Sequence, residues 1–268
     1  MLIGYNWEVM AQIKAVFFDV DNTLYDWPTQ QWVQSTLKAI RAIQRKGVKV
    51  FVCTARPYGS FREFGGLRLG VHWNGIVASC GAYVTLGRRV LRFQAMKPAN
   101  VRKLCSIAKA NSLTMELVTA KTRYLIAPGN TFLENYHGTY SDTIPPVHPY
   151  RGEGVSGALL FAPKEFDELF NKEMPGMSFF RFHDFGVDVS EVEHRKGEGI
   201  EIIMKELGLK KEEVLSFGDD FQDIAMGDSS IFVCVGNGKE EVKQAADFVC
   251  PPIVEDGIPM ALKKYGVL

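Results

Sequence analysis

The sequence predicts an α/β fold in which a parallel sheet is interrupted by an inserted α+β segment. Three observations support this: strands and helices alternate near the start of the chain, the same alternation returns near its end, and the long stretch between them has a different pattern. With 268 residues, 46% of them hydrophobic, the chain is long enough to bury a sizeable core in one large domain or two modest ones.

The first predicted strand is the apolar, β-branched run IKAVFFDV at residues 13–20, which is typical of a strand covered on both faces. Apolar residues then recur at helical spacing over residues 28–46, and Gly47 supplies a stop before the second apolar strand, VKVFVCT. A strand, a helix and a second strand in this order predict a parallel pair joined by a right-handed crossover.

The same alternation predicts a helix over residues 199–207, strands at VLSFGDD and IFVCVG with a helix between them, and a short last strand at DFVCPP. Residues 83–185 instead read as a hairpin, YVTLGRRVLRF, a helix over 99–110, and strands mixed with helical patterns. We therefore assign residues 1–82 and 186–268 to one α/β domain and residues 83–185 to an inserted α+β domain.

Charge and cysteine content exclude several classes of protein. Lysine plus arginine equal aspartate plus glutamate, at 31 each, so no overall basic field exists to hold nucleic acid or an anionic membrane. Five widely spaced cysteines without a C-x-x-C pair argue against a disulfide framework or a zinc site and favour a reducing cytoplasm. The opening MLIGYNWEVMAQ lacks the pattern of an export signal, and no run of 18 apolar residues suggests a membrane span.

Acidic residues gather where two of the predicted strands end. Asp19 and Asp21 end the first strand in DVDNTL, and GDDFQD follows the apolar run VLSF. Because the carboxyl ends of parallel strands meet at one edge of a sheet, these acids are expected to converge on one crevice. Close carboxylates repel one another unless a cation separates them, and oxygen ligands of this kind suit Mg²⁺.

Simpler interpretations exist for each of these elements alone. A solvated acidic turn would explain the first cluster, and Asp220 could serve only as the N-cap of the next helix. Thr54, at the end of the second strand, offers a hydroxyl to a phosphate but could be a helix N-cap. Lys196 could neutralise phosphate charge, although most lysines are solvated surface residues. His194 could face a substrate, but a surface position is favoured.

Taken together, the order and chemistry of four segments resemble the haloacid dehalogenase superfamily. The run DVDNTL resembles its first motif, Thr54 its second, Lys196 its third and GDDFQD its fourth. An insertion placed after Ser79-Cys80-Gly81-Ala82 resembles the capped class IIB, or Cof-type, subgroup, which includes sugar phosphatases and phosphomannomutases. The resemblance implies a Rossmann-like core with a C2B-type α+β cap that closes over the substrate.

The resemblance also implies roles for individual residues. Asp19 would be the nucleophile and a metal ligand, and Asp21 the general acid and base that also ligates metal through its backbone carbonyl. Further ligands to Mg²⁺ would be Asp219 and, directly or as a support, Asp223. Thr54, Lys196 and Gln222 would bind the phosphoryl group or the substrate. Asn22, Gln222 and Cys80 depart from the family's usual Gly, Asn and Asn.

These expectations lead to one principal function and two alternatives. The principal function is a cytoplasmic, Mg²⁺-dependent hydrolase that acts on a small phosphorylated metabolite through an aspartyl-phosphate, with sugar phosphates favoured by analogy and no nucleic-acid or membrane partner. A phosphomutase would use the same acids but require a bisphosphate activator. A non-catalytic binding protein on the same scaffold would be expected to lack the nucleophile, the acid or the metal ligand, all of which are present.

Overall fold

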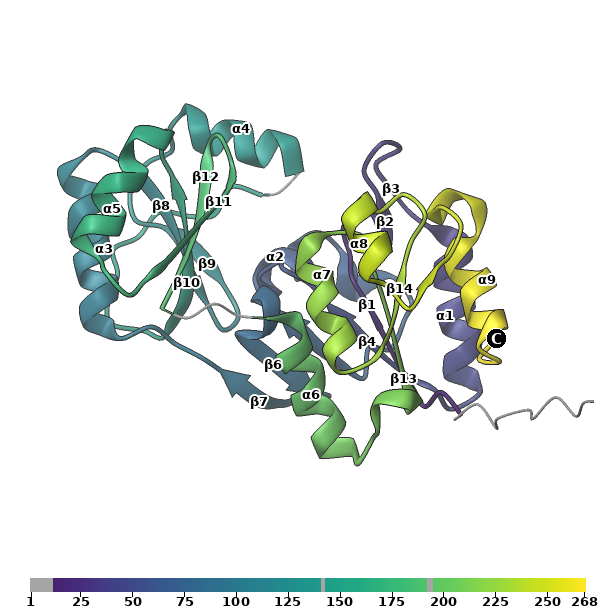
Figure 1. Ribbon diagram of the computed structural model, residues 1–268. Helices are drawn as coiled ribbons and strands as arrows, with labels where there is room; N and C mark the ends of the chain where they lie inside the picture. The colour runs from purple at the N-terminus through teal and green to yellow at the C-terminus, as the bar shows by residue number, and fades with distance from the viewer. Residues whose placement is uncertain (1–11, 141–142, 192–194) are drawn as a thin grey trace, which may run out of the picture. The chain divides into compact units, whose positions relative to one another are not determined.

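The computed structural model describes residues 12–140, 143–191 and 195–268 (Figure 1). The chain forms two compact units: one comprises Met1–Cys53, Val71–Gly75 and Lys196–Leu268, and the other Thr54–Gly70 and Ile76–Arg195. The opening segment MLIGYNWEVMA, predicted to lack an export signal, lies outside the described residues. So does His194, for which a surface position was predicted. None of the described helices has the length and apolar character that a bilayer-spanning segment requires.

The larger sheet has β1 (Ala15–Phe18) near its centre, and all four residues of this strand are buried. Its strand order is β15 (Phe248–Val249), β14 (Ile231–Cys234), β13 (Val214–Gly218), β1, β4 (Lys49–Cys53), β5 (Gly75–Ala78), β6 (Tyr83–Leu86) and β7 (Arg89–Phe93). The pairs of β1 with β13 and β4, and of β14 with β13 and β15, are parallel. The predicted α/β fold with a parallel sheet is therefore confirmed.

The first unit contains helices α1 (Gln34–Arg45), α6 (Lys196–Leu207), α7 (Phe221–Ile224), α8 (Glu240–Ala245) and α9 (Gly257–Lys264). In Figure 1, α6 and α7 lie on one side of β1 and β13, and α1 and α9 lie on the other. Helix α1 buries Leu37, Ile40 and Ile43 on its sheet-facing stripe. Gly47 follows it with φ +88°, a left-handed conformation that glycine adopts without a Cβ clash.

The predicted start of this helix was wrong. Residues 28–33 do not begin it; instead Tyr25–Asp26 (β2) pairs with Gln31–Trp32 (β3) in a hairpin. The Asp26 carboxylate accepts hydrogen bonds from the backbone N–H and the hydroxyl of Thr29, and these bonds fix the turn. Apolar spacing could not reveal this, because Trp32 satisfies a helical pattern as well as a cross-strand pair with Tyr25.

The second unit contains a five-stranded antiparallel sheet with the order β11 (Ser178–His183), β12 (Gly186–Ser190), β10 (Val155–Phe161), β8 (Thr114–Thr119) and β9 (Arg123–Leu125). Helices α2 (Tyr58–Glu63), α3 (Pro98–Ala110), α4 (Thr131–Tyr140) and α5 (Asp167–Glu173) belong to the same unit. Leu104 of α3 and Phe170 of α5 join the core on one face of this sheet, and Leu133 of α4 packs with Leu159 on the other. Short 3₁₀ helices lie at Gly66–Arg68, Ser79–Gly81, Lys164–Phe166, Lys211–Glu213, Ala225–Asp228 and Ile253–Glu255.

The two sheets do not follow the domain boundaries that were assigned from the sequence. The hairpin of β6 and β7, assigned to the insertion, extends the eight-stranded sheet. Strand β12, assigned to the region from residue 186 onward, pairs with β10 and β11 in the smaller sheet. Sequence patterns reveal strands but not their partners, because strand pairing is decided by long-range contacts.

Candidate active site

Asp19 follows β1 directly, at the carboxyl end of the parallel sheet. Its backbone N–H donates to the Phe217 carbonyl of β13 at 2.9 Å, and the ring of Phe18 stacks on that of Phe217 with 5.4 Å between centroids. Asp19 is only 4% exposed. The sheet thus fixes the position of a buried carboxylate, as the predicted convergence of strand ends requires.

The second acidic segment begins where β13 ends, at Gly218. A Cβ at this position would lie 2.4 Å from the Asp223 carboxyl carbon, so the close approach of the loop requires glycine. Asp220 is the N-cap of α7, and its side chain accepts from the Phe221 N–H at 2.6 Å. The capping role considered for Asp220 is therefore confirmed, while Asp219 beside it is buried.

Asp223 uses both of its carboxylate oxygens. Oδ2 accepts from the backbone N–H groups of Asp219, at 2.9 Å, and Asp220, at 3.0 Å. Oδ1 lies 2.6 Å from the ammonium of Lys196. Asp223 therefore supports the loop that carries Asp219 and also holds the lysine in place.

Lys196 is the first residue of α6 and is buried, with 3% of its side chain exposed. Its Nζ lies 2.6 Å from Asp19 Oδ1 and 2.6 Å from Asp223 Oδ1. A cation at a helix N-terminus is unfavourable for the helix dipole and costly to bury, so the two carboxylates must hold it there. The simpler interpretation of Lys196 as a solvated surface charge is wrong.

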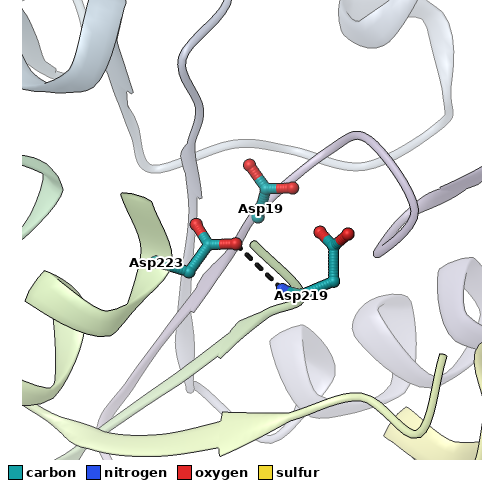
Figure 2. A group of neighbouring side chains, drawn as sticks. All are labelled: Asp19, Asp219 and Asp223. Carbon is teal, nitrogen blue, oxygen red and sulfur yellow. Dashed lines mark hydrogen bonds between the residues drawn. The ribbon is translucent and has the colours of Figure 1, made fainter. Parts of the chain in front are cut away.

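Three carboxylates converge at this point from the ends of β1 and β13 and from α7 (Figure 2). Asp19, Asp219 and Asp223 each offer an oxygen, and these oxygens lie within 4.8 Å of one another. Three carboxylates with one ammonium leave two net negative charges in a buried place. A divalent cation of an oxygen-preferring kind would balance that charge.

Burial and crowding oppose ionisation of these acids. Burial raises the pKa of Asp19 well above its usual value; the Lys196 ammonium lowers it, and the negative charges of Asp223, Asp219 and Asp21 raise it further. Burial likewise raises the pKa of Asp219 to about 8, an effect that Asp223 strengthens and Lys196 opposes. The cluster therefore has two positive charges fewer than its three carboxylates need in order to stay ionised together.

Asp21 lies beside this cluster and not among the three converging side chains. Its Oδ1 accepts a hydrogen bond of 2.9 Å from the indole N–H of Trp27, and its charge raises the pKa of both Asp19 and Asp219. The hydroxyl of Thr23 donates to Asp219 Oδ1 at 3.4 Å. Neither Trp27 nor Thr23 was selected from the sequence, since Trp27 becomes a partner of Asp21 only through the β2–β3 hairpin.

Thr54 and Gln222, which the sequence predicts to bind the phosphoryl group or the substrate, differ in exposure. Thr54, which directly follows β4, is fully buried; its N–H donates to the Val77 carbonyl at 2.8 Å, and its hydroxyl accepts from the Arg56 N–H at 3.1 Å. Gln222 is exposed on the first turn of α7. The roles of both residues in phosphate or substrate binding stay predictions.

Asn22 and Cys80, two residues that depart from the family pattern, share a left-handed backbone conformation. Asn22 has φ +54° and Cys80 has φ +52°, both in the left-handed region that glycine adopts freely and asparagine tolerates better than most residues. Asn22 thus keeps the backbone shape of a position where the family usually has glycine. The Asn22 carbonyl also accepts from the Asn237 side chain at 2.8 Å, a contact that ties this turn to the segment after β14.

The family model of the haloacid dehalogenase-like hydrolases matches residues 16–262. The chain belongs to this family. The predicted membership is confirmed, and with it the expectation of a hydrolase.

Individual relatives of this haloacid dehalogenase-like hydrolase align over nearly its whole length. YkrA of Bacillus subtilis (strain 168) is 26% identical over 258 residues, which cover 95% of this chain and 98% of YkrA. A solved structure from Geobacillus kaustophilus HTA426 is 32% identical with a TM-score of 0.88, covering 96% of this chain and all of that one. The subclass IIB sugar phosphatase BT4131 is 29% identical with a TM-score of 0.78, and the match covers 95% of this chain and 100% of BT4131.

Proposed function

We propose that this hydrolase is a Mg²⁺-dependent phosphatase that transfers the phosphoryl group of a small phosphorylated metabolite to Asp19 and then to water. The observation that carries the proposal is the buried cluster in which Lys196 bridges Asp19 and Asp223, with Asp219 beside them. Phosphoryl transfer depends mainly on positioning and on neutralising charge, and this cluster offers a fixed carboxylate, a fixed ammonium and a cation-binding group.

The chemistry of the donor set fits a magnesium ion. Three carboxylate oxygens lie within 4.8 Å of one another, and the ligands are hard oxygens with no sulfur or imidazole among them. Asp19 and Asp219 would hold the ion, with Asp223 as a further ligand or as the support that its hydrogen bonds to the loop indicate. When bound, Mg²⁺ would neutralise carboxylate and phosphate charge so that the two can approach.

Individual residues of the chain then have separate roles in the reaction. Asp19 attacks phosphorus, the bond from phosphorus to the leaving oxygen breaks, and Asp21 gives its proton to that oxygen. Asp21, now a carboxylate, takes a proton from the water that attacks the aspartyl-phosphate, so inorganic phosphate leaves and Asp19 is restored. Lys196 balances the negative charge on Asp19 and the transferred group, and Thr54 donates its hydroxyl to a phosphoryl oxygen.

We further propose that the inserted segment assigned at residues 83–185 acts as a cap that selects the substrate, with Gln222 reaching the substrate from the first turn of α7. The substrate class that we favour is the sugar phosphates. The likeness to a subclass IIB sugar phosphatase supports this choice. Water exclusion by a cap would protect the aspartyl-phosphate from unproductive attack.

A panel assay tests the function. Purified protein is incubated with sugar phosphates, other small phosphate monoesters and 4-nitrophenyl phosphate, with Mg²⁺ or with EDTA, and released phosphate is measured. We expect release that requires Mg²⁺ and is fastest with one group of sugar phosphates. Absence of release from every compound would contradict the proposed function, and release only in the presence of a sugar bisphosphate would indicate a phosphomutase.

Mg²⁺ is expected to raise the thermal stability of this protein more at pH 8 than at pH 6. The folded-state pKa of Asp219, about 8, lies above its unfolded value of 3.8. Its contribution to stability is therefore fully present at low pH and is lost as the pH rises toward and through 8. A bound cation removes the repulsion that causes this loss, so its stabilising effect grows with pH.

The Asp219→Asn variant tests the origin of that effect by thermal unfolding at both pH values. Without metal at pH 8, we expect this variant to be more stable than the wild type, because its amide carries no charge for burial and the neighbouring carboxylates to oppose. We also expect it to lose most of the Mg²⁺-dependent shift. The matched control is Asp220→Asn, which changes a half-exposed neighbour and keeps a capping side chain. Equal Mg²⁺ shifts in the two variants would contradict the assignment.

A further inference from the structure

Asp21, the proposed acid and base, makes a hydrogen bond that no motif of the sequence specifies. The indole Nε1–H of Trp27 donates to its Oδ1 at 2.9 Å. An indole nitrogen is a donor only, so this Asp21 oxygen must act as an acceptor. The bond therefore favours placing the transferable proton on the other oxygen, Oδ2, and it restrains rotation of the carboxyl group.

Trp27 is itself held by the hairpin that carries it. Its ring meets that of Tyr25 edge to face, with 5.0 Å between centroids, and Tyr25 meets Trp32 in the same way at 5.3 Å. Tyr25 and Trp32 are also opposite each other in the β2–β3 pair, and Asp26 fixes the turn through Thr29. Edge-to-face aromatic contacts and a closed turn restrict the movement of Trp27 and so fix the direction of its indole N–H group.

Resting on the function proposed above, we propose that Trp27 is a positioning residue, which orients the Asp21 carboxyl group for proton transfer. A general acid must lie within hydrogen-bond reach of the leaving oxygen and point toward it, and a carboxyl group free to rotate would spend time in unproductive orientations. The N–H donor of Trp27 supplies the restraint, and the aromatic cluster of the β2–β3 hairpin keeps that donor in place.

The test is a double-mutant cycle with Trp27→Phe, which keeps an aromatic ring but deletes the donor, and Asp21→Asn. With a sugar phosphate, whose alkoxide leaving group needs a proton, we expect Trp27→Phe to lower kcat about 10- to 100-fold, part of what acid–base catalysis contributes. In the Asp21→Asn background we expect the same substitution to cost less than about 2-fold. Trp73→Phe serves as the matched control for a Trp-to-Phe change elsewhere.

The leaving group separates positioning from a general structural role. 4-Nitrophenolate leaves without a proton, so in rapid-mixing experiments Trp27→Phe should retain the first release of nitrophenolate. It should slow the later hydrolysis of the aspartyl-phosphate, in which Asp21 takes a proton from water. A burst of nitrophenolate followed by a slow steady rate is therefore expected. An equal loss in both phases, or an equal cost of Trp27→Phe in both backgrounds of the cycle, would overturn the positioning role.

A second measurement does not require a variant of Trp27 to fold. In ¹⁵N-labelled wild-type protein, the Trp27 indole N–H should exchange slowly with solvent, and Asp21→Ala should shift its resonance and speed its exchange. An indole signal that exchanges fast and is unaffected by Asp21→Ala would overturn the proposal. A wild type that releases no phosphate would instead defeat the proposed function, and the positioning role would fall with it.

Discussion

Replacement of Asp19 by asparagine should lower phosphate release at least about 10⁴-fold, since removal of a nucleophile from a site that works by covalent catalysis leaves only residual binding effects. The side chain keeps its size, and one of three crowded carboxylates disappears. The variant should therefore fold with undiminished stability. Steady-state assays with Mg²⁺ and thermal unfolding would measure both properties.

The control for this substitution is Asp220→Asn. Asp220 lies in the other acidic segment but outside the cluster, and its half-exposed side chain caps α7 and pairs with Lys239. We expect its activity to stay within about 3-fold of wild type, as for most exposed substitutions. Activity of Asp19→Asn close to that of this control would contradict the assignment of the nucleophile.

Replacement of Lys196 by methionine should damage both stability and activity. Asp19 and Asp223 would lose the buried ammonium that lies 2.6 Å from an oxygen of each. Removing one partner of a buried ion pair costs about 3–5 kcal/mol because the remaining charge stays uncompensated. Loss of the positive charge at the transferred group should lower kcat by a further 10²- to 10³-fold, comparable to loss of one transition-state donor.

The stability effect is best measured by denaturant unfolding at pH 8 without metal, because at lower pH the two acids can be neutralised by protonation instead. Lys239→Met is the matched control: its ammonium also lies 2.6 Å from an aspartate, Asp220, but half of each side chain is exposed. We expect a change within about 1 kcal/mol for this exposed pair. Equal unfolding free energies for the two variants would show that Lys196 is not held as described.

The convergence of the acids could be predicted because it depends on local pattern and on one general rule. Asp19 follows a fully apolar strand, Asp219 follows the mostly apolar strand β13, and parallel strands bring their carboxyl ends to the same edge. The burial of Lys196 could not be predicted from local pattern, since a lysine at the start of a helix breaks the dipole preference. Only its resemblance to a family motif pointed to it.

The features that sequence reasoning missed all depend on pairing between segments. The β2–β3 hairpin was interpreted as the start of a helix, so the bond from Trp27 to Asp21 had no basis in the predicted structure. The boundary placed at residue 186 separates β12 from β10 and β11, its partners in the smaller sheet, because an apolar strand carries no mark of which sheet it joins. Such errors fall where tertiary contacts override local preference.

The central claim is that Asp19 carries the phosphoryl group during turnover, and chemical trapping of that intermediate tests it most directly. Protein mixed with a phosphate monoester and Mg²⁺ is quenched in acid within the first turnover and treated with borohydride, which reduces an acyl phosphate to an alcohol. Peptide mass spectrometry then locates the reduced residue. We predict reduction at Asp19 that disappears with EDTA and in Asp19→Asn; rapid phosphate release with Asp19 unmodified, or with another residue reduced in its place, would contradict the mechanism.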